Sequence, residues 1–185
     1  MAERPHIYIL GSGHVGRAIA DQFQHLPFRT ILIDQRENEL ARCRATVEKR
    51  ISAIPEVNIQ TAPAGSAFIV LTHDHSLDFL LAASALDRGD AAYVGLIGSQ
   101  TKRTRFEKWL RESKNGSAHL NTLVCPIGRS GTQDKRPEII AAFVAAEVVE
   151  AVSALHLTAS SHDSAINQNP TNEQINTPQS AGISL

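Results

Sequence analysis

The chain has 185 residues, 42% of them apolar, a formal net charge of -1 and only two cysteines. This size and composition suit a single domain with one core. The near-neutral charge argues against a general affinity for nucleic acid, and the cysteines are too few for a disulfide framework or a zinc site. Without a bilayer-spanning apolar stretch or a signal-peptide pattern, we expect a soluble cytoplasmic protein with no nucleic-acid or membrane partner.

Short apolar runs alternate with helical patterns along most of the chain. We predict strands at residues 6–10, 29–34, 67–72, 92–97 and 120–125, and a less clear edge strand at 45–47. The helices are predicted at 15–26, 37–43, 76–88, 100–112 and 137–155. Continuously apolar strands separated by helices indicate the α/β class, with a doubly wound parallel sheet that is covered on both faces.

The C-terminal third contains an unusual helix and a change of composition. The predicted helix at 137–155 is apolar around most of its girth, so it must be covered on more than one side. Packing onto the sheet would cover one side, and a homodimer interface, which we also expect, would cover another. The polar tail has two prolines and no aromatic residue. We therefore predict one domain over 1–156 and a disordered tail over 157–185.

Three glycines follow the first predicted strand with the spacing Gly-x-Gly-x-x-Gly. Gly11, Gly13 and Gly16 open the next helix, where backbone N–H groups can hold a phosphate. Asp34 ends the second strand, at a place where an acid can accept hydrogen bonds from a ribose. Two plainer roles stay open, since the glycines can serve the turn and the packing alone, and Asp34 can cap the following helix.

A second polar cluster follows the strand at 67–72. Thr72, His73, Asp74 and His75 leave this strand and enter a helix. The carboxyl ends of parallel strands line the ligand crevice of such a sheet. The histidines could bind a metal or donate hydrogen bonds to a polar ligand, with Asp74 orienting one of them. Helix capping by Asp74 or Ser76 is the alternative.

Positive charge follows the strand at 92–97. Gly98 permits a close backbone approach, and Ser99 is a candidate N-cap. Lys102 and Arg103 lie in the first turns of the next helix, where cations oppose the helix dipole. Their placement calls for an anionic ligand or a partner surface, unless they belong to a solvated face.

These motifs together resemble a known family. The chain is similar to the C-terminal Rossmann-like domain of the XdhC/CoxI family over roughly residues 6–152. The resemblance rests on motifs in this order: Gly-x-Gly-His-Val-Gly-Arg-Ala from Gly11, Asp34-x-Arg36, Thr72-His-Asp-His-x-x-Asp78, the stretch from Tyr93 to Phe106, Pro126-Ile-Gly128 and Pro137-Glu-Ile139.

The resemblance implies a function. Proteins of this family are accessory factors that bind molybdenum cofactor, promote its sulfurated form and deliver it to xanthine dehydrogenase or a related molybdenum hydroxylase. It therefore implies a maturation chaperone rather than an enzyme, with molybdopterin as ligand and a cysteine desulfurase as a further partner. The glycine loop would hold the phosphate, and the polar turns would meet the pterin or the molybdenum oxo groups. The implied cofactor-binding residues are Gly11, Gly13, His14, Gly16, Asp34, Arg36, Thr72, His73, Asp74, His75, Gly98, Ser99, Lys102 and Arg103.

Two other functions compete with this hypothesis. The glycine loop and Asp34 also suit an NAD(P)-dependent oxidoreductase, although little chain remains for a substrate domain, or a nucleotide-sensing module. Longer family members carry a further domain before this one, which we expect to be lacking here. Arg129 and Ser130 replace residues that are usually apolar in the family, so we predict a rearranged connection over 129–136. Cys125 could ligate molybdenum or carry sulfur, but we expect a buried structural thiol.

Overall fold

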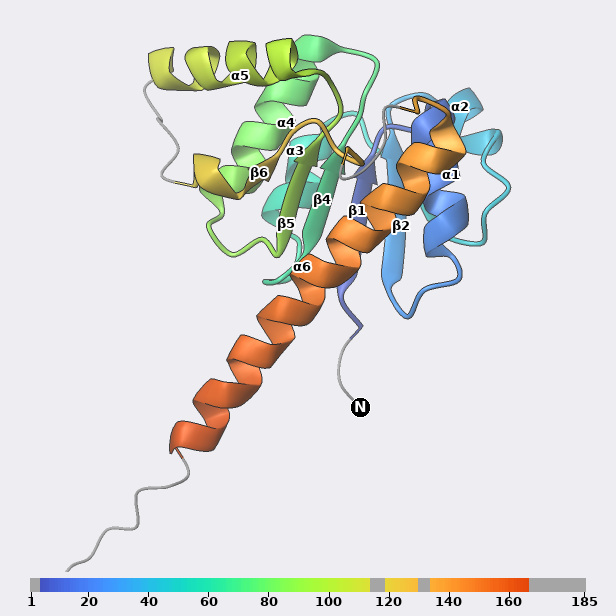
Figure 1. Cartoon of the computed structure of the whole chain (residues 1–185). Coiled ribbons are helices and arrows are strands. Elements are labelled where there is room, and N and C mark those ends of the chain that lie inside the picture. Colours follow the sequence, from blue (N-terminus) through green and yellow to red (C-terminus); the bar gives the residue numbers. More distant parts are fainter. Residues whose placement is uncertain (1–3, 114–118, 130–133, 167–185) are drawn as a thin grey trace, which may run out of the picture.

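The computed structural model describes residues 4–113, 119–129 and 134–166. It confirms the predicted Rossmann-like α/β class, with a parallel six-stranded sheet in the order β3-β2-β1-β4-β5-β6 (Figure 1). The strands are β1 (His6–Leu10), β2 (Arg29–Asp34), β3 (Glu48–Ile51), β4 (Ala67–Val70), β5 (Tyr93–Leu96) and β6 (Leu123–Val124). The helices are α1 (His14–Phe23), α2 (Glu37–Ala41), α3 (Pro55–Gln60), α4 (His75–Asp87), α5 (Gln100–Glu112) and α6 (Pro137–Ile166).

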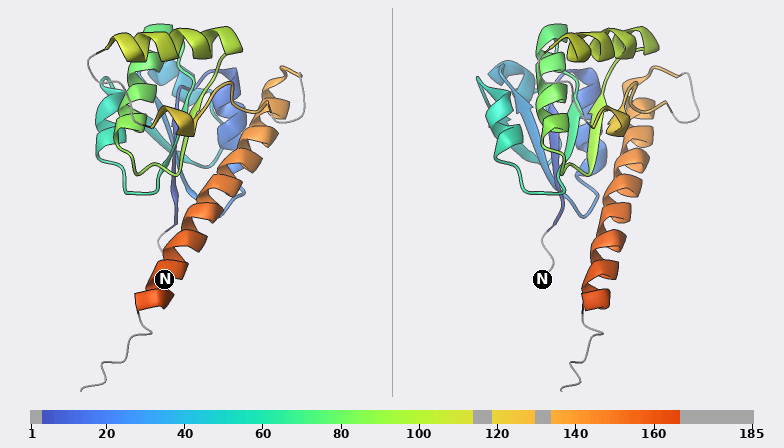
Figure 2. Two further views of the ribbon diagram at one scale, coloured as in Figure 1. Left: turned by 60° about the vertical axis from the view of Figure 1, so that its left-hand side comes forward. Right: turned by 90° about the vertical axis from the view of Figure 1, so that its left-hand side faces the viewer.

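Side chains of the sheet alternate between two apolar cores. Residues such as Ile7, Ile9 and Ile69 face α1 and α6, whereas Leu10 and Phe68 face the side of α4 and α5. Figure 2 shows the helices on both sides of the sheet. This alternation explains why the central strands read as continuous apolar runs, because both faces of each strand are buried.

The edges of the sheet differ from the sequence prediction. The strand expected at 45–47 lies at 48–51, because Glu48 to Ile51 pair in register with Ile31 to Asp34 of β2. Its charged side chains suit an edge and carry no apolar signal. Helix α3, which begins with Pro55, was not predicted. The last strand is shorter than the predicted 120–125, because Leu120–Thr122 form a 3₁₀ turn.

Helix α6 packs along α1 and β5 and then runs on beyond the sheet (Figures 1 and 2). Its buried side chains include Ala141, Val144, Val148 and Val152. Packing onto the domain, one of the two predicted covers, is therefore confirmed. No helix within the described part of the chain has both the length and the apolar character needed to span a membrane.

The predicted boundary between domain and tail at 156/157 falls inside α6, which continues to Ile166. The helix therefore extends into the predicted tail. Residues 167–185 of the predicted tail lie outside the described residues.

Candidate functional site

The site is built at the carboxyl ends of β1 and β4, the neighbours between which the strand order reverses. Loops leave such a pair toward opposite sides, and this opens a crevice at the edge of the sheet. A shallow pocket lies there. It is lined by the polar or glycine residues Gly11, Asp34, Gln35, Thr72 and His73 and by the apolar Leu10, Ile33, Pro55 and Leu77.

The three glycines of the loop are present for different physical reasons. Gly11 has a φ of +127°, and a Cβ there would overlap the backbone carbonyl of Leu71. A Cβ on Gly16 would overlap the carbonyl of Gly11. These two glycines let the turn and the helix pack closely.

Gly13 is different, because its φ of -69° and ψ of -171° suit any residue. Apart from Gly13 and its two chain neighbours, no described residue has a heavy atom within 4 Å of a Cβ built there. Gly13 is also the N-cap of α1. The fold therefore does not require this glycine, and the backbone at the positive end of the helix is open to approach there.

Asp34 braces the glycine loop from β2. Its Oδ2 accepts hydrogen bonds from the Ser12 N–H at 2.7 Å and from Arg36 Nη2 at 3.1 Å. Its Oδ1 accepts the Arg36 N–H at 2.9 Å and Nε at 3.0 Å. Burial alone would raise the pKa of Asp34, but these hydrogen bonds outweigh it and hold that pKa below its ordinary value. The carboxylate thus already has four donors.

Two further residues that were given no role in the sequence support the same loop. Arg17 donates from Nη1 to the Ser12 carbonyl at 2.6 Å and to Glu39 Oε2 at 2.8 Å. The Ser12 hydroxyl donates to the carbonyl of Glu39 at 3.1 Å. Arg17 belongs to the Gly-Arg-Ala part of the motif, so the signal was present, but Glu39 carried none.

The second polar turn has both structural and exposed residues. Asp74 caps α4 by accepting the N–H groups of Ser76 at 2.7 Å and Leu77 at 3.3 Å, which confirms the capping alternative. His73 and His75 are exposed, and only His73 lines the shallow pocket. In the part of the chain that the structure covers, no group of three or more His, Cys, Asp or Glu side chains is arranged to hold a metal ion.

The third turn differs from the expectation. The Lys102 ammonium forms an ion pair with Asp78 Oδ2 at 2.5 Å, and both side chains are buried. Arg103 binds Glu107 at 2.8 Å and the Leu123 carbonyl at 3.0 Å. The anions that these cations call for are therefore supplied within the chain. Ser99 accepts the Lys102 N–H at 3.2 Å, as expected of an N-cap.

A contact within the chain also explains the glycine at position 98. A Cβ at this position would lie 2.6 Å from Cδ of Lys102, so the glycine makes room for the lysine stem on its way to Asp78. Gly98 and Ser99 line a separate groove, whose other side is formed by Pro126, Gly128 and Ile140 among others. The three polar turns thus share one edge of the sheet but line two different hollows.

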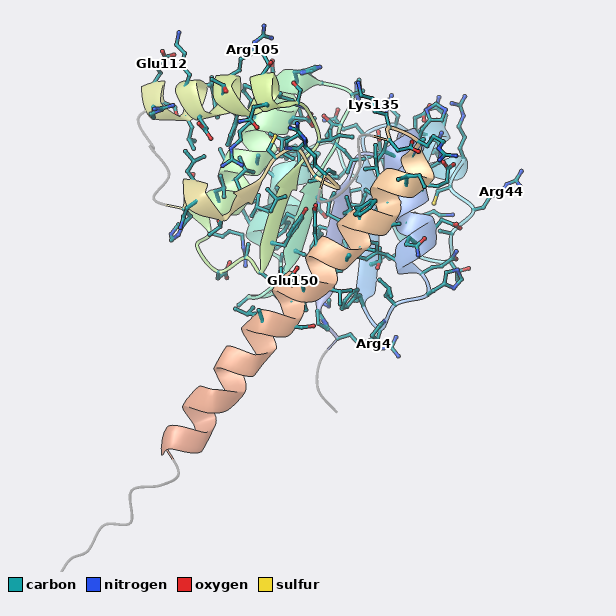
Figure 3. The ribbon with its side chains drawn as sticks, viewed as in Figure 1. Arg4, Arg44, Arg105, Glu112, Lys135 and Glu150 are labelled. Atoms are coloured by element: carbon teal, nitrogen blue, oxygen red, sulfur yellow. The ribbon has the colours of Figure 1, made fainter. Side chains whose placement is uncertain are left out.

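The remaining predicted residues lie near this edge. His14 is exposed at the start of α1, and Arg36 is bound to Asp34. Two residues labelled in Figure 3, which were not predicted, mark the two ends of the strands. Lys135 lines the groove at the carboxyl end, whereas Arg4 precedes β1 at the opposite end.

The loop after β6 is anchored from α6. Tyr93 on β5 donates its hydroxyl proton to Glu147 Oε2 at 2.8 Å, and the Gly128 N–H donates to Glu147 Oε1 at 3.0 Å. Burial raises the pKa of Tyr93 strongly, and the neighbouring Glu147 raises it further. Burial also raises the pKa of the Cys125 thiol, against the opposing effect of Lys102 and Arg103. Residues 130–133 of the predicted rearranged connection lie outside the described residues.

Comparison with known proteins gives this fold and its motifs a family. The family model that is described as the XdhC Rossmann domain matches residues 7–148. The chain belongs to the XdhC family. No curated protein matches this XdhC-family chain. A crystal structure described as a xanthine dehydrogenase from Bacillus halodurans has the same fold, with a TM-score of 0.67 and 19% sequence identity. The match covers 83% of this chain and 44% of that one, so the XdhC-family chain spans less than half of that protein.

Proposed function

We propose that this XdhC-family chain binds molybdenum cofactor and acts as an accessory protein in the maturation of a xanthine dehydrogenase or a related molybdenum hydroxylase. The observation that carries the proposal is the open space over Gly13 at the N-terminus of α1, two residues after Gly11, which lines the pocket at the ends of β1 and β4. Family membership indicates which phosphorylated ligand to expect there.

The residues present fit such a ligand. The space over Gly13 admits a phosphate at the backbone N–H groups of α1, whose first turn, His14 to Arg17, contains no acid. His73 offers a polar group in the pocket wall, and Leu10, Pro55 and Leu77 form its apolar part. When bound, the cofactor supplies an oxygen-sensitive metal–dithiolene centre, so the task of these residues is to hold, orient and shield it.

A nicotinamide dinucleotide is the second candidate, because the strand order and the position of Asp34 suit one. A ribose at Asp34 would have to compete with the N–H groups of Ser12 and Arg36 and with the Arg36 guanidinium. This competition favours a ligand that makes no ribose contact there. An NAD(P)-dependent enzyme or a nucleotide sensor would need Asp34 to give up part of this network.

The proposed partners follow from the same role. The client would be the hydroxylase, and a cysteine desulfurase would provide the sulfur for the sulfurated cofactor. A homodimer would cover the side of α6 that the domain leaves open, where Val149 is 37% exposed. We propose that the protein acts in the cytoplasm.

A titration of the purified chain tests this function. We expect tight binding of molybdenum cofactor and weak or no binding of NAD(H) and ATP. Gly13→Glu would place a negative charge where the phosphate lies and should abolish binding without unfolding the chain. Gln22→Glu, which adds the same charge on the exposed side of α1, is the matched control. Micromolar binding of NAD(H) together with no cofactor binding would refute the chaperone role.

A further inference from the structure

A buried ion pair connects two of the polar turns. Asp78 and Lys102 are 1% and 8% exposed, and they join the first turns of α4 and α5. Removing two charges from water is costly, so such a pair is weak evidence of stabilisation and suggests a need for defined geometry. Oδ2 of Asp78 binds Lys102, which leaves Oδ1 for another group.

That group is Thr72, directly after β4. Oδ1 of Asp78 accepts both the Thr72 N–H and the Thr72 hydroxyl, each at 2.8 Å. The same hydroxyl accepts the Asp74 N–H at 3.2 Å and lies 3.0 Å from the Asp74 carbonyl. The Thr72 hydroxyl therefore links Asp78 to the backbone of the turn from Thr72 to Asp74, and His73 lies at the tip of this turn.

The tip of this turn forms part of the pocket wall. His73 lines the pocket together with Gly11 and Asp34, whereas His75 does not line it. Gly98 lets the stem of Lys102 pass close to the backbone on its way to Asp78. The chain from Lys102 through Asp78 and Thr72 to His73 thus connects the end of β5 with the crevice beside β1.

We propose that Asp78 and Lys102 are positioning residues, which act through Thr72 to hold His73 against the ligand beside the glycine loop. His73, and not His75, is then the histidine that contacts the ligand. This proposal rests on the proposed function for the identity of the ligand, but the placement of His73 can be measured without any ligand.

The first test uses the free protein. The Cε1–Hε1 NMR signal of His73 is compared between wild type and Thr72→Val, which removes the hydroxyl but keeps the Asp78–Lys102 pair. We expect the His73 signal to move toward the position of a histidine in an unfolded chain, while the signal of His25 stays. Thr61→Val is the matched control, because its hydroxyl donates to the Val57 carbonyl of α3. An unchanged His73 signal in folded Thr72→Val would overturn the proposal.

Lys102→Met tests the other end of this hydrogen-bond network, at the ion pair with Asp78. Where this variant folds, it should move the His73 signal in the same direction as Thr72→Val. A signal that stays at the wild-type position in folded Lys102→Met would show that the ion pair does not position this turn. Thr72→Val keeps the test decisive if the loss of the lysine prevents folding.

The second test is a double-mutant cycle for the binding of molybdenum cofactor. We expect Thr72→Val and His73→Ala each to lower affinity about tenfold, and the double variant to bind no more weakly than His73→Ala. His75→Ala should bind like wild type. Losses that multiply to about a hundredfold in the double variant, or full affinity in His73→Ala, would refute the proposal. If wild type does not bind the cofactor, the proposed function fails and the NMR comparison decides the positioning role.

Discussion

Separate substitutions of Gly11 and Gly13 should distinguish the role of the glycine loop in folding from its role in binding. Gly11 has a φ of +127° and faces the Leu71 carbonyl, so an alanine there is both strained and obstructed. Strain of this kind costs about 1–3 kcal/mol, and the overlap with backbone adds to it. We expect Gly11→Ala to lower the free energy of unfolding by at least about 3 kcal/mol.

Gly13→Ala should behave differently. Its backbone conformation suits alanine, and no described atom obstructs the methyl group. The gain of about 0.4–1 kcal/mol from a less flexible unfolded chain nearly cancels the loss of about 0.5–1 kcal/mol for alanine at an N-cap. The free energy of unfolding should therefore stay within about 1 kcal/mol of wild type.

Thermal unfolding followed by circular dichroism measures both effects. For a chain of this size 1 kcal/mol corresponds to a Tm shift of about 2–4 °C. Gly13→Ala should melt within about 4 °C of wild type and Gly11→Ala at least about 6 °C lower. Gly13→Ala should also bind molybdenum cofactor at least about tenfold more weakly, because its methyl group occupies the approach to the helix N-terminus. If Gly13→Ala melts as early as Gly11→Ala, the fold does require Gly13. If Gly13→Ala binds like wild type, the space over Gly13 is not the phosphate site.

Three further predictions concern the groups around the site. The pKa of Asp34 is lowered in the folded state, so its contribution to stability is complete above its unfolded-state pKa and is lost as the pH falls below about 4. Asp34→Asn should therefore reduce the loss of unfolding free energy at acid pH, measured by urea titrations at several pH values. An unchanged loss would show that Asp34 does not cause it. Burial raises the pKa of Cys125, so iodoacetamide at neutral pH should alkylate this thiol far more slowly in the folded protein than in the unfolded chain. Equal rates would contradict its burial. Tyr93→Phe removes a buried hydrogen bond to Glu147 and should cost about 1.5–3 kcal/mol in chemical denaturation, whereas a cost near zero would show that this hydrogen bond does not stabilise the fold.

Much of the site was predictable because its residues follow strands directly. An apolar strand that ends in glycine or in polar residues places them at the carboxyl edge of a parallel sheet. In the structure Gly11, Asp34 and Thr72, which follow three different strands, do line one pocket. It could not reveal the partners of Asp34 or Lys102, because a hydrogen bond between residues that are 22 or 24 positions apart leaves no local pattern.

The sequence by itself determined the α/β class, the order of most elements and the family, since apolar periodicity and local motifs are properties of neighbouring residues. Only the tertiary structure decided that Gly13 is the glycine with open space and that Lys102 is neutralised within the chain. It also decided that α6 continues to Ile166. Whether a polar group is free to bind a ligand depends on which distant groups surround it after folding, and charge or spacing along the chain does not record this.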